Sequence, residues 1–204
     1  MNIANCTNTP NFEAKLVARA ITPKSEFQIL EIDKIADAEA LKKLNGSFNR
    51  ENILQRFPDN QLLSATLAFI NRAFESINNP NTKSYITLID GKPSALMTLE
   101  TSNPAQYIHL DYLAAWKPEG VQKPYYNGKV LIRHLFENAI VNKTKNIDLT
   151  PGFKSDEFYE KLGFEKLGFD FFISHNKRVE NTKKIDETLK YEVLEVQPQV
   201  DLIV

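Results

Sequence analysis

Polar and apolar side chains alternate in short runs near the N-terminus and change to helical spacing further along the chain. The runs over residues 12–21 and 26–32 predict two strands. A helix is predicted over residues 36–44, and two more helical stretches are predicted on either side of Pro58, which interrupts them. The Asn- and Pro-rich segment 78–81 ends the last of these helices.

The remaining two thirds of the chain predict strands that first pair by a hairpin and later alternate with helices. The Asp90-Gly91-Lys92-Pro93 segment is a turn between two apolar runs. The predicted order after that turn is strand, strand, helix, strand, helix, strand. This order predicts a mixed α/β sheet with helices on both faces. The predicted bounds are strands 84–89, 95–99, 107–115, 146–149 and 164–174, and helices 129–142 and 156–162.

Composition excludes several classes of protein. The 204 residues carry a formal net charge of −1, which argues against a nucleic-acid partner. No apolar run is long enough to span a bilayer, and no secretory signal is evident, so no membrane partner is expected. The single cysteine, Cys6, cannot form an internal disulfide, and a cytoplasmic location is expected. No zinc-ligand spacing, P-loop or dinucleotide fingerprint occurs, and no metal is expected.

The chain is predicted to hold one domain. Residues 1–11 are polar and predicted to be flexible, and residues 12–174 are predicted to form the domain. Residues 175–204 are predicted to be a C-terminal extension. This extension could add a strand over residues 191–196, bind a partner, or lie as a solvated tail on the sheet.

One segment carries a resemblance to a known family. Residues 158–164 read Phe-Tyr-Glu-Lys-Leu-Gly-Phe, and they follow a longer helix by about twenty residues. Ser155 can cap the short helix at its start, and Gly163 suits a left-handed residue at its end. This segment resembles the C-terminal half of the GCN5-related N-acetyltransferases (GNATs), and the resemblance covers residues 85–174. The resemblance implies a GNAT-like fold with a mixed, mostly antiparallel sheet. It also implies an enzyme that transfers an acetyl group from acetyl-CoA to a primary amine.

The resemblance also implies where acetyl-CoA binds. In the family, backbone amides at the start of the long helix hold the pyrophosphate, as helix N-termini do for anions. The family's glycine-rich motif aligns here with Asn127, Val130 and Ile132, so two β-branched side chains are expected where the diphosphate comes close. Gly152 stands where many members have an Asn that contacts the pantetheine arm. The implied cofactor-binding residues are Ala114, Ala115, Asn127, Gly128, Lys129, Val130, Leu131, Ile132 and Gly152.

Three residues are the candidates for catalysis. Tyr159 aligns with a tyrosine that resembles the general acid of many members, although an aromatic there also packs on the sheet. Asp111 is the first candidate for the base and Glu100 the second, and each could equally be an ordinary surface residue. His109 shares the face of Asp111, because strand side chains repeat every two residues. His134 lies inside the predicted cofactor helix and would at best contact phosphate.

Two alternatives to an acetyl-CoA-dependent enzyme remain open from the sequence. The chain could be a catalytically inactive GNAT-like binding or regulatory module that has lost CoA binding, or it could use a carrier-bound acyl donor. Trp116, Tyr125 and Tyr126 could line a substrate mouth, or they could cover the sheet edge. Family members often pair through their last strands, so a homodimer is an open expectation.

Overall fold

A computed structural model describes residues 12–57, 63–101, 107–118, 121, 126–152 and 155–194. The predictions that rest on Cys6, Pro58 and Tyr125, and on residues 195–204, lie outside the described residues.

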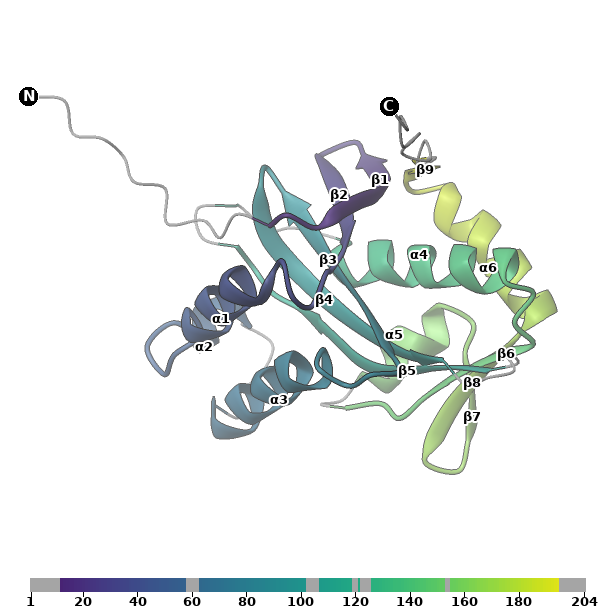
Figure 1. Ribbon diagram of the computed structural model, residues 1–204. Coiled ribbons are helices and arrows are strands. Elements are labelled where there is room, and N and C mark those ends of the chain that lie inside the picture. The colour runs from purple at the N-terminus through teal and green to yellow at the C-terminus, as the bar shows by residue number, and fades with distance from the viewer. Residues whose placement is uncertain are drawn as a thin grey trace, which may run out of the picture.

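In the described part of the chain, nine strands form one sheet in the order β7-β8-β6-β5-β4-β3-β2-β1-β9 (Figure 1). Only the β5–β6 pair is parallel, and the other neighbours run antiparallel. The predicted mixed, mostly antiparallel α/β sheet is therefore confirmed. The strands are β1 (Lys15–Thr22), β2 (Ser25–Glu31), β3 (Thr82–Ile89), β4 (Lys92–Thr101), β5 (Tyr107–Ala115), β6 (Asn146–Leu149), β7 (Glu165–Leu167), β8 (Asp170–Ser174) and β9 (Lys190–Val193).

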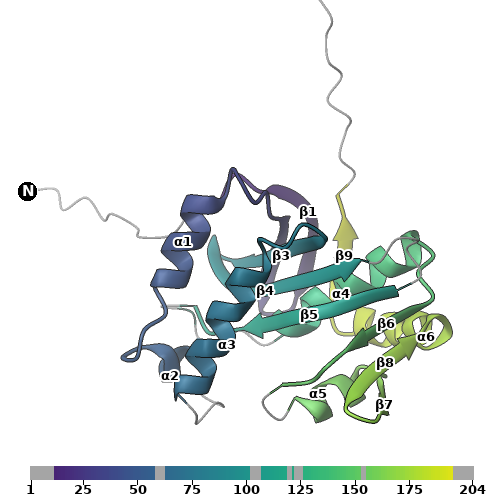
Figure 2. The same ribbon diagram turned by 60° about the horizontal axis from the view of Figure 1, so that its bottom comes forward.

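Six helices in the described residues cover the two faces of this sheet (Figure 2). Helices α1 to α3 pack on one face, called here the α3 face, and α4 to α6 pack on the other, called the α4 face. None of the described helices is long and apolar enough to cross a membrane. The bounds are α1 (Ala38–Gly46), α2 (Ile53–Arg56), α3 (Leu63–Ser76), α4 (Asn127–Val141), α5 (Asp156–Lys161) and α6 (His175–Asp186).

Turn residues account for one correct prediction and one error. Asp90 and Gly91 both have positive φ, 50° and 71°, as the turn of a tight hairpin requires, and they join β3 to β4 as predicted. The single strand predicted over residues 164–174 is wrong. Gly168, at φ 67°, turns the chain within it, so that β7 and β8 form a hairpin at one edge of the sheet.

Helix α6 was not predicted from the sequence, and it carries the C-terminal residues onto the same core. Its Arg178 is fully buried and donates hydrogen bonds to the carbonyls of Thr144 and Lys145, just before β6. Ile185 joins the core of the α4 face. Beyond the helix, β9 pairs with β1 at the far edge of the sheet.

Candidate active site

The parallel strands β5 and β6 separate part-way along β5. Residues Tyr107–Leu110 pair with Asn146–Leu149, and β6 then ends while β5 continues to Ala115. Asp111 is left without a register partner on β4, so it is the extra residue of a β-bulge. The second half of β5 therefore presents backbone groups that β6 does not bond, and a gap in the sheet starts at Asp111.

Helix α4 begins at the head of this gap. The side-chain amide of Asn127 donates to the carbonyls of Ser94, at 3.2 Å, and Trp116, at 3.1 Å, which fixes the helix start to β4 and to the end of β5. The first helical hydrogen bond runs from Val130 to Tyr126, at 2.8 Å. The N–H groups of residues 127–129 therefore have no partner within the helix, and the positive end of its dipole lies there.

The predicted obstruction by two β-branched side chains is corrected by the structure. Val130, Leu131 and Ile132 are all fully buried in the core of the α4 face. Three successive positions are buried because the sheet covers one side of α4 and α6 covers another. Their side chains therefore point away from solvent, and the free amides lie one turn earlier, at residues 127–129.

Tyr126, the residue before α4, has a strained backbone. Its φ is 89°, a left-handed conformation that costs a non-glycine residue about 1 kcal/mol or more. Its ring lies 5.5 Å from the Lys129 ammonium. Strain of this kind gathers at functional sites, where the surrounding structure imposes it.

Gly128 and Lys129 form the first turn that faces the gap. A Cβ on Gly128 would lie 3.4 Å from the Phe158 ring and 3.8 Å from Leu113, so α4 is close to both α5 and β5 here. The Lys129 ammonium donates to the Thr188 hydroxyl at 2.8 Å. Burial lowers the pKa of Lys129. Among the residues that the structure describes, no carboxylate forms an ion pair with this lysine.

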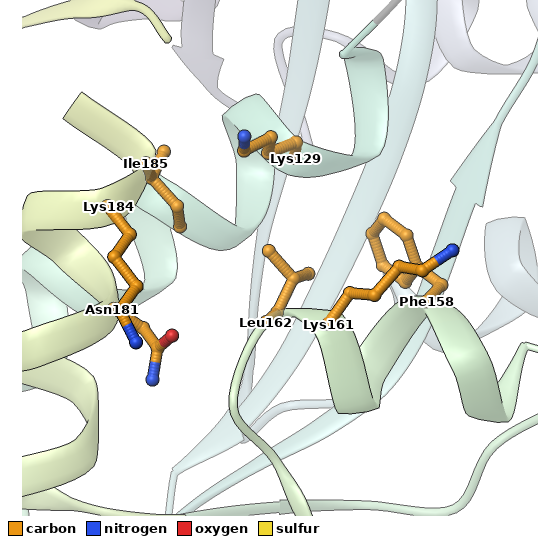
Figure 3. A pocket seen from close by; sticks show the side chains of 7 residues that line it. All are labelled: Lys129, Phe158, Lys161, Leu162, Asn181, Lys184 and Ile185. Carbon is orange, nitrogen blue, oxygen red and sulfur yellow. The ribbon is translucent and has the colours of Figure 1, made fainter. Parts of the chain in front are cut away.

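A cavity of about 240 Å³ lies between α4, α5 and α6 (Figure 3). Three lysines surround an apolar floor, and each comes from a different helix. Of the lining residues, the sequence predicted only Lys129 to bind the cofactor. Asn181, Lys184 and Ile185 lie on α6, which was not predicted. The cavity is lined by Lys129, Phe158, Lys161, Leu162, Asn181, Lys184 and Ile185.

A second group of ionisable side chains lies on the α3 face, where the gap starts. Burial raises the pKa of Asp111, while a hydrogen bond from Ser76 opposes that rise, and Asp111 interacts with both His109 and Glu100. The imidazole Nδ1 of His109 lies 3.4 Å from Oδ1 of Asp148 on β6. Sequence reasoning missed Asp148, although the parallel register sets it directly opposite His109. The structure thus brings the two candidate bases, Asp111 and Glu100, together with His109.

Tyr159 lies on the α4 side of the sheet, away from these bases. Only 7% of it is exposed, and its ring contacts Phe158 and Phe164, with centroids 5.1 Å and 5.6 Å away. Burial raises the pKa of its phenol. The candidate acid and the candidate base are therefore on opposite faces, with the gap between β5 and β6 separating them.

The remaining predicted binding residues lie in different parts of the structure. Ala114 is buried in the core of the α3 face, and Ala115 is exposed at the end of β5. Gly152 is exposed near Phe69 of α3, so it borders the α3 face and not the α4 face. Trp116 is buried, and its indole donates to the Pro93 carbonyl at 2.8 Å, so it covers the sheet and lines no mouth.

His134 does not contact the phosphate position that the sequence suggested for it. It is buried, its Nδ1 lies 2.6 Å from the Tyr191 hydroxyl, and its ring packs edge-on against Tyr85. Burial lowers the pKa of His134 to about 3, with a further contribution from Arg133. It therefore ties α4 to β3 and β9 as a neutral side chain. Within the described ranges, no cluster of His, Cys, Asp and Glu could hold a metal ion.

Comparison with known proteins found no matching family model and no matching curated protein. Solved structures do match. AtaTR bound with acetyl-CoA has a TM-score of 0.52 at 16% identity, over 76% of this chain and 96% of that one. The PaiA N-acetyltransferase from Thermoplasma acidophilum, in complex with coenzyme A, has a TM-score of 0.50 at 18% identity, over 72% and 96%. The chain has the GNAT fold. FdhC, a nucleotide-linked sugar GNAT, matches over 87% of this chain and 99% of its own, with a TM-score of 0.50 at 12% identity. At these identities the likeness establishes the GNAT fold and no activity.

Proposed function

We propose that this chain is an N-acetyltransferase that moves an acetyl group directly from acetyl-CoA to a primary amine of a small molecule or a protein. The observation that carries the proposal is the gap between β5 and β6, which opens at the Asp111 bulge with the free amides of α4 at its head. Two structures of the same fold carry acetyl-CoA or coenzyme A, which supports a cofactor of this kind.

The residues around the gap suit the chemistry of acetyl-CoA. The amides of Gly128 and Lys129 and the positive end of α4 suit the pyrophosphate, because free N–H groups and a partial positive charge attract an anion. The Lys129 ammonium adds a full charge that no described carboxylate neutralises. The unpaired edge of β5, residues 111–115, suits the amides of the pantetheine arm. Ala115 leaves space there because its side chain is small.

The proposed reaction needs a neutral amine and a route for two protons. Asp111, on the α3 face, takes one proton from the substrate ammonium, and the neutral amine nitrogen then attacks the acetyl carbonyl carbon. The bond from that carbon to sulfur breaks as Tyr159 donates its phenolic proton to the departing thiolate. The second proton, which the nitrogen loses as it becomes the amide nitrogen, restores the phenol of Tyr159. Burial raises the pKa of Asp111, which makes it a better base near neutral pH.

The phenol of Tyr159 also fits its role, with one condition. Because burial raises its pKa, the phenol keeps its proton across the physiological range. A thiolate that forms in the same dry surroundings has its own pKa raised by desolvation. The proton transfer is therefore favourable only if water stays excluded from the α4 side of the gap.

One observation favours the alternative of a module without CoA binding. The Phe158 ring is so close to Gly128 that a Cβ there would lie 3.4 Å from it, which narrows the space between α5 and the first turn of α4. Phe158 is only partly buried, so a rotamer change can widen that space. The two functions therefore differ in one measurable property, the affinity for CoA.

Calorimetric titration with acetyl-CoA and, separately, with CoA tests the proposal. We expect micromolar binding of both. A panel of a diamine, a polyamine, an aminoglycoside and a lysine peptide would follow, with thiol release as the readout. No binding at millimolar acetyl-CoA, by protein whose circular dichroism shows that it is folded, would overturn the enzyme and favour the binding module.

A further inference from the structure

We propose that α6 makes this chain selective for the 3′-phosphate of CoA, with Lys184 binding that phosphate and Asn181 forming the wall beside it. The inference rests on the proposed function, and it assigns a role to a helix that sequence reasoning did not foresee. Its basis is the cavity between α4, α5 and α6, in which α6 supplies one wall (Figure 3).

The α6 wall is held firmly against the other two helices. The hydrogen bond from Lys129 to Thr188 joins the first turn of α4 to the residues just after α6. At the end of α5, a Cβ on Gly163 would lie 2.0 Å from the Asn181 side-chain nitrogen, so only glycine allows this approach. Gly163 also has a φ of 85°, which glycine adopts without strain. The α6 wall therefore contacts both the first turn of α4 and the end of α5.

The side chains in the cavity suit a phosphorylated purine nucleoside. Phe158, Leu162 and Ile185 form an apolar floor of the kind on which a purine ring packs. The three lysines that line the same cavity provide positive charge for phosphates. The α4 end, with Lys129 and the free amides, suits the 5′-pyrophosphate of CoA. The α6 wall of the same cavity carries Lys184, and we assign to it the one remaining anionic group of the nucleotide, its 3′-phosphate.

The lysines of this cavity are available to a ligand at low cost. Lys184 pairs with Glu180 at 2.6 Å, and Lys161 pairs with Glu157 at 2.7 Å, each one turn away on its own helix. Both pairs are well exposed, and solvent-exposed pairs of that kind contribute little stability. A dianionic phosphate competes well with such a partner, because charge-assisted hydrogen bonds to phosphate are among the strong ones.

A matched pair of variants on α6 tests the inference. Lys184→Gln removes the charge in the cavity, and Lys183→Gln removes the same charge from the next position, which is exposed and does not line the cavity. CoA and 3′-dephospho-CoA are titrated calorimetrically into both variants and the unaltered chain. We expect the unaltered chain to bind CoA about tenfold more tightly than 3′-dephospho-CoA at low salt. Lys184→Gln should lose most of this ratio by weakening CoA binding alone, whereas Lys183→Gln should keep it.

The other possible results contradict either the role of α6 or the proposed function. Equal affinity of the unaltered chain for the two ligands, or an unchanged ratio in Lys184→Gln, overturns the role of α6 while the proposed function stands. An equal loss in Lys183→Gln shows a general effect of helix charge and also overturns it. If neither ligand binds the folded chain, the proposed function fails and the inference fails with it.

Discussion

The two faces of the sheet carry different ionisable side chains around the candidate site. On the α4 face, Lys129, Lys161 and Lys184 surround one cavity. On the α3 face, Asp111 and Glu100 lie together with His109. The α4 face also offers free helix amides, whereas the carboxylates of the α3 face suit a cationic ligand.

This difference indicates how the two faces divide the proposed work. An anionic cofactor and a basic amine are attracted to opposite sides and can meet only at the gap. The two faces are also assembled differently. Each lysine of the α4 face comes from a different helix, whereas the acidic residues of the α3 face lie on the neighbouring strands β4 and β5. Substitutions on one face should therefore leave the property of the other face unchanged.

The largest expected effect is that of Asp111→Asn. This change should lower kcat with the best amine of the panel by about a hundredfold or more, because the proton acceptor is lost. Asp111 must be ionised to act as the base, and its pKa is raised. The activity of the unaltered chain should therefore decrease as the pH is lowered, and this decrease should begin at a pH above the usual pKa range of Asp. The variant should lack this acid limb. An unchanged rate, or a matching loss of acetyl-CoA affinity by calorimetry, would contradict the division between faces.

His134→Gln should change how the free energy of unfolding depends on pH in the acid range, and it should leave the affinity for acetyl-CoA unchanged. The pKa of His134 is about 3 in the folded chain and about 6.5 when unfolded, so the unfolded state binds the extra proton between these values. The free energy of unfolding should therefore fall as the pH drops through 6.5, by roughly 3 kcal/mol at pH 4.5. Urea unfolding at pH 7.5 and 4.5 should show a smaller fall in the variant. An altered affinity for acetyl-CoA would instead return His134 to the ligand site.

Lys129→Gln should weaken acetyl-CoA binding by about tenfold at low salt, because a partly buried cation without a carboxylate partner is lost. The pH dependence of kcat should stay as in the unaltered chain, since that property belongs to the α3 face. Lys143→Gln, at an exposed position beyond the far end of α4, is the control and should bind normally. Equal affinities in the two variants would remove Lys129 from the site.

The smallest expected effect is that of Tyr126→Gly. Glycine adopts a φ of 89° without strain, so the variant should gain about 1 kcal/mol in stability, less any contribution of the lost ring. Thermal unfolding measures this gain. If the variant is instead less stable, contacts of the ring outweigh the strain, and Tyr126 is a packing residue.

The sequence predicted most of the fold because its signals were local. The Asp90-Gly91 turn and the short helix that ends before Gly163 are each specified by neighbouring residues, and both are present, although Ser155 makes no side-chain capping hydrogen bond. The period of two along β5 placed His109 and Asp111 together, although the bulge at Asp111 leaves no mark in the sequence. Helix α6 escaped prediction because its buried positions include Arg178, Asn181 and Thr182, so apolar residues do not recur at helical spacing.

By itself, the sequence determined the order of most elements, the turns and the run of residues 158–164, because propensity, capping and backbone sterics act between near neighbours. Only the tertiary structure decided that Val130 and Ile132 face the core and that Asp148 lies opposite His109. The packing of α6 beside Gly163 was decided in the same way. Each of these facts depends on which surfaces meet across the sheet, and burial between residues far apart in the chain leaves no periodic signal.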